Sequence, residues 1–328
     1  MIPFLLAGAG GLGLLGGGLA AFSGATACTI EKKVPRDGEL IEVDGQTIHY
    51  TDEGSGPPIV MIHGLGGQLR NFARAMVDDL ARDYRVIRVD RPGSGYSPRA
   101  ASTSARLRVQ AETIAEFIRI LKLDRPLIVG HSLGGALALS LALNHPDVVG
   151  GLALIAPLTQ VQDIKDVPEV FKGLVIRSPA LRRTIAWTIA TPIGMATAEK
   201  SLKEVFAPEP VPADFGTEGG GLLAMRPSNF YASSSDLVDL EGELEGMVGR
   251  YPTLSVPVGI LYAGADNLLN AVLHGERTAG EIPGAEIEMV EGGHMLPFTQ
   301  PGLAAAFVRR AAARLPTLEQ PHARHAAE

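Results

Sequence analysis

The hydrophobic positions of this chain switch repeatedly between strand-like and helix-like spacing. Residues 38–54, GELIEVDGQTIHYTDEG, alternate polar and apolar side chains around Asp44-Gly45, a pattern typical of a β-hairpin. Further along, short continuous apolar runs typical of buried strands are separated by stretches with helical spacing. These runs read PPIVMIHG, YRVIRVD, RPLIVG and VVGGLALIAP. Strands that alternate with helices in this way predict a mostly parallel sheet covered by helices on both faces.

The alternation stops between residues 158 and 250. Helix-like patches there are separated by Pro- and Gly-rich connectors such as APEPVPADFGTEGGG. The strand pattern then resumes with VGILYAGAD and AEIEMVEGG, and PGLAAAFVRRAAARL predicts a last helix. The sequence therefore predicts one α/β core made of residues 31–157 and 251–315. Residues 158–250 form a helical insertion in that core, and residues 316–328 form a loose tail.

The N-terminal segment, residues 1–30, has a different composition from the rest. It is rich in Leu, Ala, Phe and Gly, and no charged side chain occurs before Glu31. This length exceeds the roughly 20 apolar residues that span a bilayer as a helix. We therefore expect membrane association through residues 1–30 as a transmembrane anchor. Two alternatives stay open: a signal or lipoprotein segment cleaved ahead of Cys28, which would give a secreted or periplasmic protein, and a buried glycine-rich helix.

Composition narrows the classes of partner. The 328 residues carry a net charge of −7 at pH 7, 46% of them are hydrophobic and 20% are charged. No basic stripe with interleaved aromatic residues occurs, which argues against a nucleic-acid partner. Because Cys28 is the one cysteine, an internal disulfide framework and a cysteine-rich metal site are excluded. His322 and His325 are too isolated to indicate a metal site, and we expect neither a metal nor another cofactor.

A serine lies among closely spaced glycines in the stretch VGHSLGG, residues 129–135. It follows an apolar run typical of a strand and precedes an Ala- and Leu-rich run typical of a helix. The stretch contains the G-x-S-x-G pattern of a nucleophile elbow, in which a strained turn exposes the serine Oγ. Glycine is unfavourable in strands and helices, and here it keeps Cβ atoms out of a sharp turn. Ser132 is therefore the predicted catalytic nucleophile.

A serine hydroxyl is a poor nucleophile without a base, and its partners should follow later strands in the order acid, then histidine. Asp266 follows the run VGILYAGAD, and His294 follows AEIEMVEGG. We predict His294 as the base and Asp266 as the acid that orients it. Asp163, shortly after GLALIAP, is the alternative acid. Asp90 precedes the serine and is expected to accept hydrogen bonds from N–H groups of its own turn.

Acyl transfer also needs donors for the oxyanion. The stretch HGLGG, residues 63–67, follows an early strand, and its glycines allow the backbone N–H groups to turn inward. We predict the backbone N–H groups of Leu65 and Leu133 as the oxyanion hole. His63 sits where this loop turns and is interpreted as a residue that braces the loop.

The stretches HGLGG, DRPGSGYS, GHSLGG, GAD and GGHMLPFTQP, in this order, resemble the α/β-hydrolase superfamily. The resemblance covers roughly residues 38–314 and is strongest to capped serine hydrolases: esterases, cofactor-free haloperoxidases and carbon–carbon bond hydrolases. It implies the α/β-hydrolase fold, with the insertion at 158–250 as a cap over the active site. Epoxide hydrolases and haloalkane dehalogenases are similar overall but use an aspartate nucleophile, which Ser132 argues against.

The resemblance implies hydrolysis of a small-molecule ester through a Ser-His-Asp triad and an acyl-enzyme. The cap is mostly apolar, with Trp187 among its side chains, and this favours small to medium apolar acyl groups. One alternative is a carbon–carbon hydrolase of a dienoate ketone, whose acidic substrate needs a fixed positive charge. Another is a ligand-binding protein with a vestigial triad. The arginines that could supply the charge are Arg182, Arg183, Arg226 and Arg250.

Overall fold

The structure, a computed structural model, describes residues 2–100, 102–161 and 167–316, with the backbone alone for residues 2–13. Its centre is an eight-stranded sheet with the strand order β1-β2-β4-β3-β5-β6-β7-β8. Only β1 and β2 run antiparallel to their neighbours, and the strands from β4 to β8 pair in parallel. The prediction of a mostly parallel sheet is confirmed. The strands are β1 (Glu39–Val43), β2 (Gln46–Glu53), β3 (Pro58–Ile62), β4 (Arg85–Val89), β5 (Leu127–His131), β6 (Gly151–Ile155), β7 (Val258–Ala263) and β8 (Glu286–Val290).

The predicted hairpin joins β1 to β2. Val43 pairs with Gln46 across a two-residue turn, and both turn residues have positive φ, 49° at Asp44 and 76° at Gly45. A type I′ turn requires positive φ at both central positions, and Asp-Gly adopts it at low cost.

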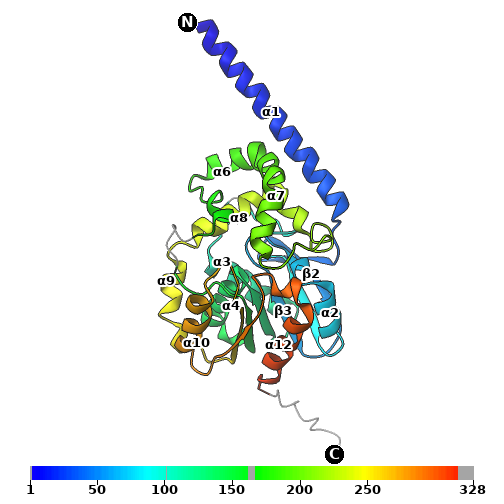
Figure 1. Ribbon diagram of the computed structural model, residues 1–328, viewed down its shortest axis with the longest axis vertical. Helices are drawn as coiled ribbons and strands as arrows, with labels where there is room; N and C mark the ends of the chain where they lie inside the picture. Colours follow the sequence, from blue (N-terminus) through cyan, green and yellow to red (C-terminus); the bar gives the residue numbers. More distant parts are fainter. Residues whose placement is uncertain (1, 101, 162–166, 317–328) are drawn as a thin grey trace, which may run out of the picture.

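Helices cover both faces of the sheet (Figure 1). Alternate side chains of one strand point to opposite faces, so Val60 and Ile62 join one hydrophobic cluster while Ile59 and Met61 join the other. The first cluster includes side chains of α3 and α4, and the second includes side chains of α2 and α12. The helices of this core are α2 (Arg74–Leu80), α3 (Leu107–Ile120), α4 (Leu133–Asn144), α10 (Arg277–Glu281), α11 (Leu296–Thr299) and α12 (Pro301–Ala313), with shorter turns η1 (Leu69–Asn71), η2 (Pro146–Val148), η6 (Tyr251–Thr253) and η7 (Val272–Glu276).

Residues 158–250, which lie between β6 and β7, consist of helices joined by turns and loops where they are described, and we call them the cap. Figure 1 shows its helices α6, α7 and α8 beyond one end of the sheet, in green and yellow. The division of the chain into core, cap and tail stays a prediction, and the tail beyond Pro316 lies outside the described residues. The cap helices are α5 (Glu169–Lys172), α6 (Pro179–Ile185), η4 (Ala186–Ala190), α7 (Thr191–Phe206), η5 (Gly221–Met225), α8 (Pro227–Asp239) and α9 (Glu243–Val248).

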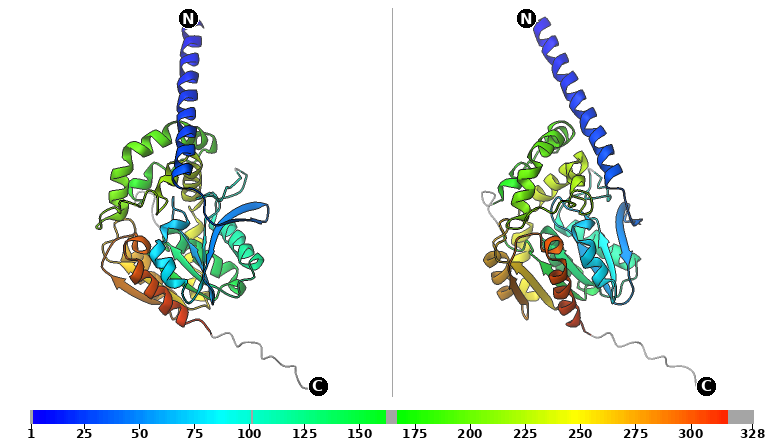
Figure 2. Two further views of the ribbon diagram at one scale, coloured as in Figure 1. Left: turned by 90° about the vertical axis from the view of Figure 1, so that its right-hand side faces the viewer. Right: turned by 45° about the vertical axis from the view of Figure 1, so that its right-hand side comes forward.

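The N-terminal helix α1 (Ile2–Lys33) runs along the side of the cap and extends past it, away from the sheet (Figure 2). Its C-terminal end packs against the protein, because Ile30 is buried with Leu223 of the cap, and Glu31 forms an ion pair of 2.9 Å with Arg226. Within the described part of the chain, no helix combines the length and apolar character that crossing a bilayer requires. The side chains of residues 1–13, which belong to the predicted anchor, lie outside that part, and membrane association stays a prediction.

Candidate active site

Ser132 lies at the turn between β5 and α4, with φ 54° and ψ −121°. A non-glycine residue at positive φ is unfavourable and is held there by its surroundings. Gly130 and Gly134 are required because backbone atoms lie too close to them for a side chain to fit. A Cβ atom at Gly134 would lie 2.1 Å from the carbonyl oxygen of Ile62, and one at Gly130 would lie 2.5 Å from the carbonyl oxygen of Gly134. The turn places Ser132 at the N-terminus of α4, where the helix dipole favours negative charge.

His294 and Asp266 are paired by a hydrogen bond of 2.7 Å between His294 Nδ1 and Asp266 Oδ2, and both side chains are buried. The other carboxylate oxygen, Oδ1, accepts the backbone N–H groups of Leu268 and Leu269 at 2.8 and 3.0 Å. Burial favours a higher pKa for Asp266, but His294 and these N–H groups outweigh it and lower the pKa below its ordinary value. Asp266 is therefore an ionised carboxylate with a defined orientation. Asp163, the alternative acid, lies outside the described residues.

Ser132 and His294 line the same cavity, which lies between core and cap and has a volume of about 330 Å³. The structure records no hydrogen bond between the side chains of these two described residues. Such catalytic contacts are often long in ligand-free structures and tighten when substrate binds. The rest of the described lining comes from both core and cap and is mainly apolar. The charged side chains among it are Arg177, Glu241 and Glu245, and the apolar ones are Leu65, Leu133, Leu158, Val161, Val167, Pro168, Phe171, Val175, Leu237, Val238, Leu240, Leu244, Leu268 and Leu269.

Leu65 and Leu133, the predicted oxyanion donors, both line this cavity. The structure records no hydrogen bond from either backbone N–H group to another described residue. The loop that carries Leu65 lies directly against the serine, because a Cβ atom at Gly64 would be 2.9 Å from Ser132 Cβ. The structure therefore brings all five predicted site residues to one place.

Two further histidines near the site are buried and electrically neutral at neutral pH. Burial, together with the Arg91 charge, lowers the pKa of His63 to about 4, and its Nε2 accepts the backbone N–H of Arg91 at 3.1 Å. Burial and the neighbouring His294 lower the pKa of His131 to about 3. His131 Nε2 lies 3.0 Å from the carbonyl oxygen of His294, so this ring braces the loop that carries the base. Asp90 accepts the N–H of Tyr96 in its own turn at 2.7 Å.

Two residues of the site's surroundings were missed by the sequence analysis. Arg91 is fully buried behind the loop of residues 63–67. Glu209 of the cap accepts the backbone N–H of Gly293, next to His294, at 3.1 Å with both of its carboxylate oxygens. Arg91 could have been noticed because a charged residue two positions after a buried strand is placed where it must find partners inside the protein. The sequence around Glu209 carries no comparable signal.

Trp187, one of the apolar side chains of the cap, lies away from the cavity. Its side chain is 47% exposed, it lies next to Gly24 of α1, and it does not line the cavity. The four arginines considered as substrate-binding groups do not line the cavity either. Each of them contacts other residues. Arg182 contacts Ile176 and Ser235, and Arg183 contacts Tyr231. Arg226 contacts Glu31 and Asn229, and Arg250 contacts Asn144. Among the described residues, no cluster of His, Cys, Asp and Glu could hold a metal ion.

Comparisons with known proteins agree with the fold. Residues 57–190 match the family model of the alpha/beta hydrolase fold. The chain is similar to the magnesium-chelatase 30 kDa subunit of Rhodobacter capsulatus, with 28% identity over 75% of this chain and 83% of that protein. It is also similar to 2-hydroxymuconate semialdehyde hydrolase of Pseudomonas sp. (strain CF600), with 35% identity over 37% of this chain and 44% of that protein.

Among solved structures, a thermophilic esterase from Thermogutta terrifontis superimposes with a TM-score of 0.68. The two sequences are 20% identical, and the superposition covers 84% of this chain and 98% of the esterase. The eight-stranded, mostly parallel sheet, the family model and these matches lead to one conclusion: the chain has the α/β-hydrolase fold.

Proposed function

We propose that the protein is a serine hydrolase that cleaves carboxylic esters of small to medium apolar acyl groups. The observation that carries this proposal is the arrangement around one cavity. Ser132, held in a strained turn, and His294, bonded to the buried Asp266, both face a mainly apolar space of about 330 Å³. Ligand sites of enzymes are typically cavities of this size with few polar groups, and an activated nucleophile needs such a base.

The mechanism follows from these positions. His294 takes the proton of Ser132 Oγ while Oγ forms a bond to the acyl carbon, and the carbonyl oxygen becomes an oxyanion held by the N–H groups of Leu65 and Leu133. His294 then gives the proton to the departing alkoxide, and the acyl group remains bonded to Ser132 Oγ as an acyl-enzyme. A water molecule loses its proton to His294 and attacks the acyl carbon, and Ser132 leaves with the proton as the acid is released. Asp266 stabilises the imidazolium of His294 during both the formation and the hydrolysis of the acyl-enzyme.

The cavity lining favours an ester over the acidic substrate of a carbon–carbon hydrolase. Arg177 is the basic side chain among the described lining residues. It is 65% exposed and already paired with Glu241 at 2.9 Å, so it offers no buried charge for a carboxylate. A site that selects an acid normally places a desolvated, hydrogen-bonded cation against it. The likeness to 2-hydroxymuconate semialdehyde hydrolase keeps the carbon–carbon reaction as the alternative to be tested.

A panel of p-nitrophenyl esters of increasing acyl length, with a dienoate ketone as the competing substrate, tests the proposed reaction. We expect ester turnover that is abolished by an organophosphonate and a ketone cleavage rate at background level. Cleavage of the ketone with kcat/KM above that of every ester would make the carbon–carbon hydrolase the correct function. Tight ligand binding without turnover of either substrate would indicate a binding protein.

We expect Phe171, not Trp187, to influence acyl-length preference. Phe171 of α5 lines the cavity, so Phe171→Ala enlarges it. The ratio of kcat/KM for longer over shorter acyl esters should rise about 10-fold, the lower end of the discrimination that one methylene gives in an apolar pocket. Trp187→Ala is the matched control, because it removes an aromatic cap residue outside the lining. An equal shift in both variants would contradict this assignment.

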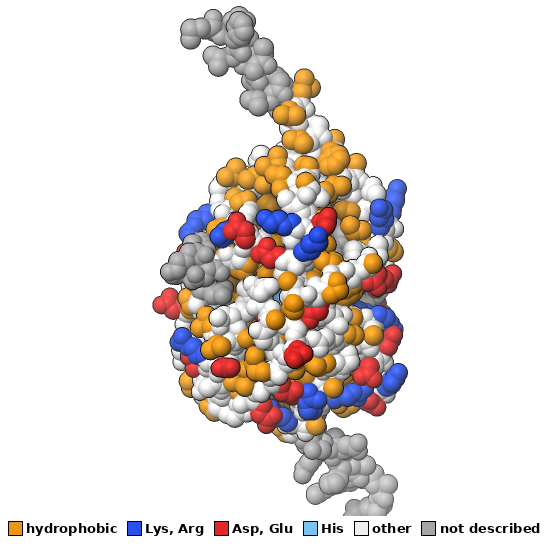
Figure 3. All heavy atoms as spheres, viewed as in Figure 1, with side chains coloured by type: hydrophobic (Ala, Val, Ile, Leu, Met, Phe, Trp, Pro, Cys, Tyr) orange, Lys and Arg blue, Asp and Glu red, His pale blue; other side chains and the backbone are white. Residues whose placement is uncertain are grey.

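We further propose that the chain associates with a membrane through α1 and the adjoining face of the cap. Large exposed apolar side chains gather on α1, α6, η4 and α7, and Figure 3 shows them at the end of the molecule where α1 leaves it. Membrane binding at an interface increases with the apolar area that is buried in lipid. The side chains are Leu14, Leu15, Phe22, Leu181, Trp187, Ile189, Ile193 and Met195.

Sedimentation of the full chain with phospholipid vesicles tests this placement. The double variant Trp187→Glu and Ile193→Glu should bind vesicles at least several-fold more weakly, because it puts two charges on the proposed contact surface. Val272→Glu, which changes an equally exposed apolar side chain on η7, should bind like the parent protein. Absence of vesicle binding by the parent chain, or equal binding by all three proteins, would contradict the proposal.

A further inference from the structure

Arg91 is a fully buried arginine that joins the loop of residues 63–67 to the cap. Its Nε and Nη2 donate to the carbonyl oxygens of His63 and Gly64 at 3.1 and 3.0 Å. Its Nη1 donates to Asp236 of α8 at 2.8 Å and to Gln110 of α3 at 3.0 Å. Neither charged side chain is exposed by more than 1%. A planar guanidinium that is bonded on three sides has a single orientation.

The bond to Gly64 bears directly on the oxyanion hole. The carbonyl of Gly64 and the N–H of Leu65 belong to one peptide group, which is planar and normally trans, so the two point in opposite directions. The carbonyl oxygen is held by Arg91, by His63 Nδ1 at 2.9 Å and by the N–H of Gly67 at 3.3 Å. Holding the oxygen end of this peptide orients its N–H end, and a bond from a cation polarises the peptide so that its N–H becomes a stronger donor.

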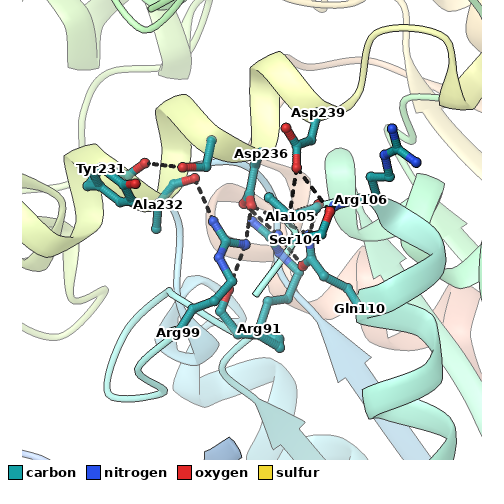
Figure 4. A network of polar contacts seen from close by, with 12 residues as sticks. Arg91, Arg99, Ser104, Ala105, Arg106, Gln110, Tyr231, Ala232, Asp236 and Asp239 are labelled. Carbon is teal, nitrogen blue, oxygen red and sulfur yellow. Dashed lines mark hydrogen bonds and ion pairs between the residues drawn. The ribbon is translucent and has the colours of Figure 1, made fainter. Parts of the chain in front are cut away.

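Asp236 is the carboxylate paired with Arg91, and it belongs to the cap. Its Oδ2 accepts from Arg91, and its Oδ1 accepts from Arg99 at 2.6 Å (Figure 4). Arg99 also donates to the carbonyl oxygen of Ala232, one turn earlier on α8, at 3.1 Å. Removal of one partner from a buried ion pair leaves the other charge without compensation and is strongly destabilising. Without Asp236 we expect the Arg91 guanidinium to shift toward other partners and to hold the carbonyl of Gly64 less firmly.

We propose that Arg91 and Asp236 are positioning residues of the oxyanion hole and couple the place of the cap to the donor strength of the Leu65 N–H group. This inference rests on the proposed function, since it assigns a role within the acyl-transfer site. The cap would then have two roles: it lines the substrate cavity, and through Asp236 it positions the oxyanion donor. When α8 is seated on the core, Asp236 holds Arg91, and Arg91 holds the Gly64–Leu65 peptide.

Asp236→Asn tests the coupling, and Asp239→Asn is its matched control. Asp239 lies on the same helix and also joins the cap to the core, through Ser104 Oγ and the Ala105 N–H at 3.2 and 2.9 Å, but it does not contact Arg91 (Figure 4). Loss of an oxyanion donor lowers kcat by about 10²–10³, so its misorientation in Asp236→Asn should lower kcat for an ester about 10-fold. KM should change little, because Asp236 does not line the cavity. Asp239→Asn should keep the parent kcat.

Inhibition by a trifluoromethyl ketone separates positioning from general loosening. Ser132 Oγ adds to its carbonyl carbon, the proton passes to His294, and the carbonyl oxygen becomes an oxyanion. Asp236→Asn should weaken this inhibitor by the same factor as kcat/KM, and it should leave the affinity of the matching unreactive alcohol unchanged. Parent-like kcat and inhibitor affinity in a folded Asp236→Asn protein, or equal losses in Asp239→Asn, would overturn the inference.

Two controls keep the test decisive. If Asp236→Asn does not fold, Asp236→Glu replaces it, because it retains the charge and moves the carboxylate by one methylene. Failure of the proposed function itself would be recognised separately: the parent protein would neither hydrolyse esters nor bind the trifluoromethyl ketone more tightly than the alcohol.

Discussion

Ser132→Ala is expected to lower ester turnover by on the order of 10⁴–10⁶, an effect that loss of His294 should match. The substitution removes the oxygen that forms the acyl-enzyme, and no other covalent route is available in the proposed mechanism. Substrate affinity should be retained, because exchange of a hydroxyl for hydrogen leaves the shape of the cavity unchanged. Steady-state kinetics, with binding of a slow substrate measured by calorimetry, give the two quantities separately.

The control for this variant is Ser140→Ala, a buried serine on the same helix, α4, that does not line the cavity. It should retain the parent turnover, which shows that α4 tolerates the loss of a hydroxyl. His294→Ala should be about as damaging as Ser132→Ala, and the double variant little worse, because the two residues act as one unit. Near-parent turnover in Ser132→Ala would refute the serine-hydrolase mechanism.

Asp266→Asn is expected to reduce turnover by up to about 10⁴ while the protein stays folded. Asp266 Oδ1 is held by the N–H groups of Leu268 and Leu269, so the oxygen of the new amide will occupy that position and its NH₂ will face His294. An NH₂ group can only donate to His294 Nδ1. That bond selects the tautomer with hydrogen on Nε2, which cannot accept the proton of Ser132.

Kinetics of Asp266→Asn and Asp163→Asn, measured side by side, decide which carboxylate orients the base. We expect the loss in Asp266→Asn alone. Near-parent activity in Asp266→Asn together with loss in Asp163→Asn would assign the acid to the earlier strand and leave the roles of Ser132 and His294 unchanged.

The sheet could be predicted from local patterns because each pattern reflects the backbone conformation of the short segment that contains it. Asp44-Gly45 predicts a turn with positive φ, and VGHSLGG predicts a sharp turn with no Cβ atom at Gly130 or Gly134. The structure contains both turns. The place of Asp266 and His294 followed from the general property that loops after parallel strands meet at one edge of the sheet.

Contacts between distant parts of the chain could not be predicted in this way. Arg91 and Asp236 are 145 residues apart, and no sequence pattern around either residue indicates that the two form a pair. Trp187 is one of the large apolar residues of the cap, but hydrophobic spacing does not determine whether such a side chain lines the cavity or packs against another helix. Trp187 lies next to α1. The apolar composition of α1 did not predict this contact, because an apolar helix can pack against lipid or against the surface of the cap.

Mass spectrometry of the protein after reaction with a fluorophosphonate ester will show whether Ser132 is the covalent nucleophile. We expect one adduct for each protein molecule, on the peptide that contains Ser132, with loss of ester turnover in proportion to labelling and no adduct in Ser132→Ala. An adduct on another residue that tracks the loss of turnover, or full ester turnover by protein labelled at Ser132, would contradict covalent catalysis by Ser132.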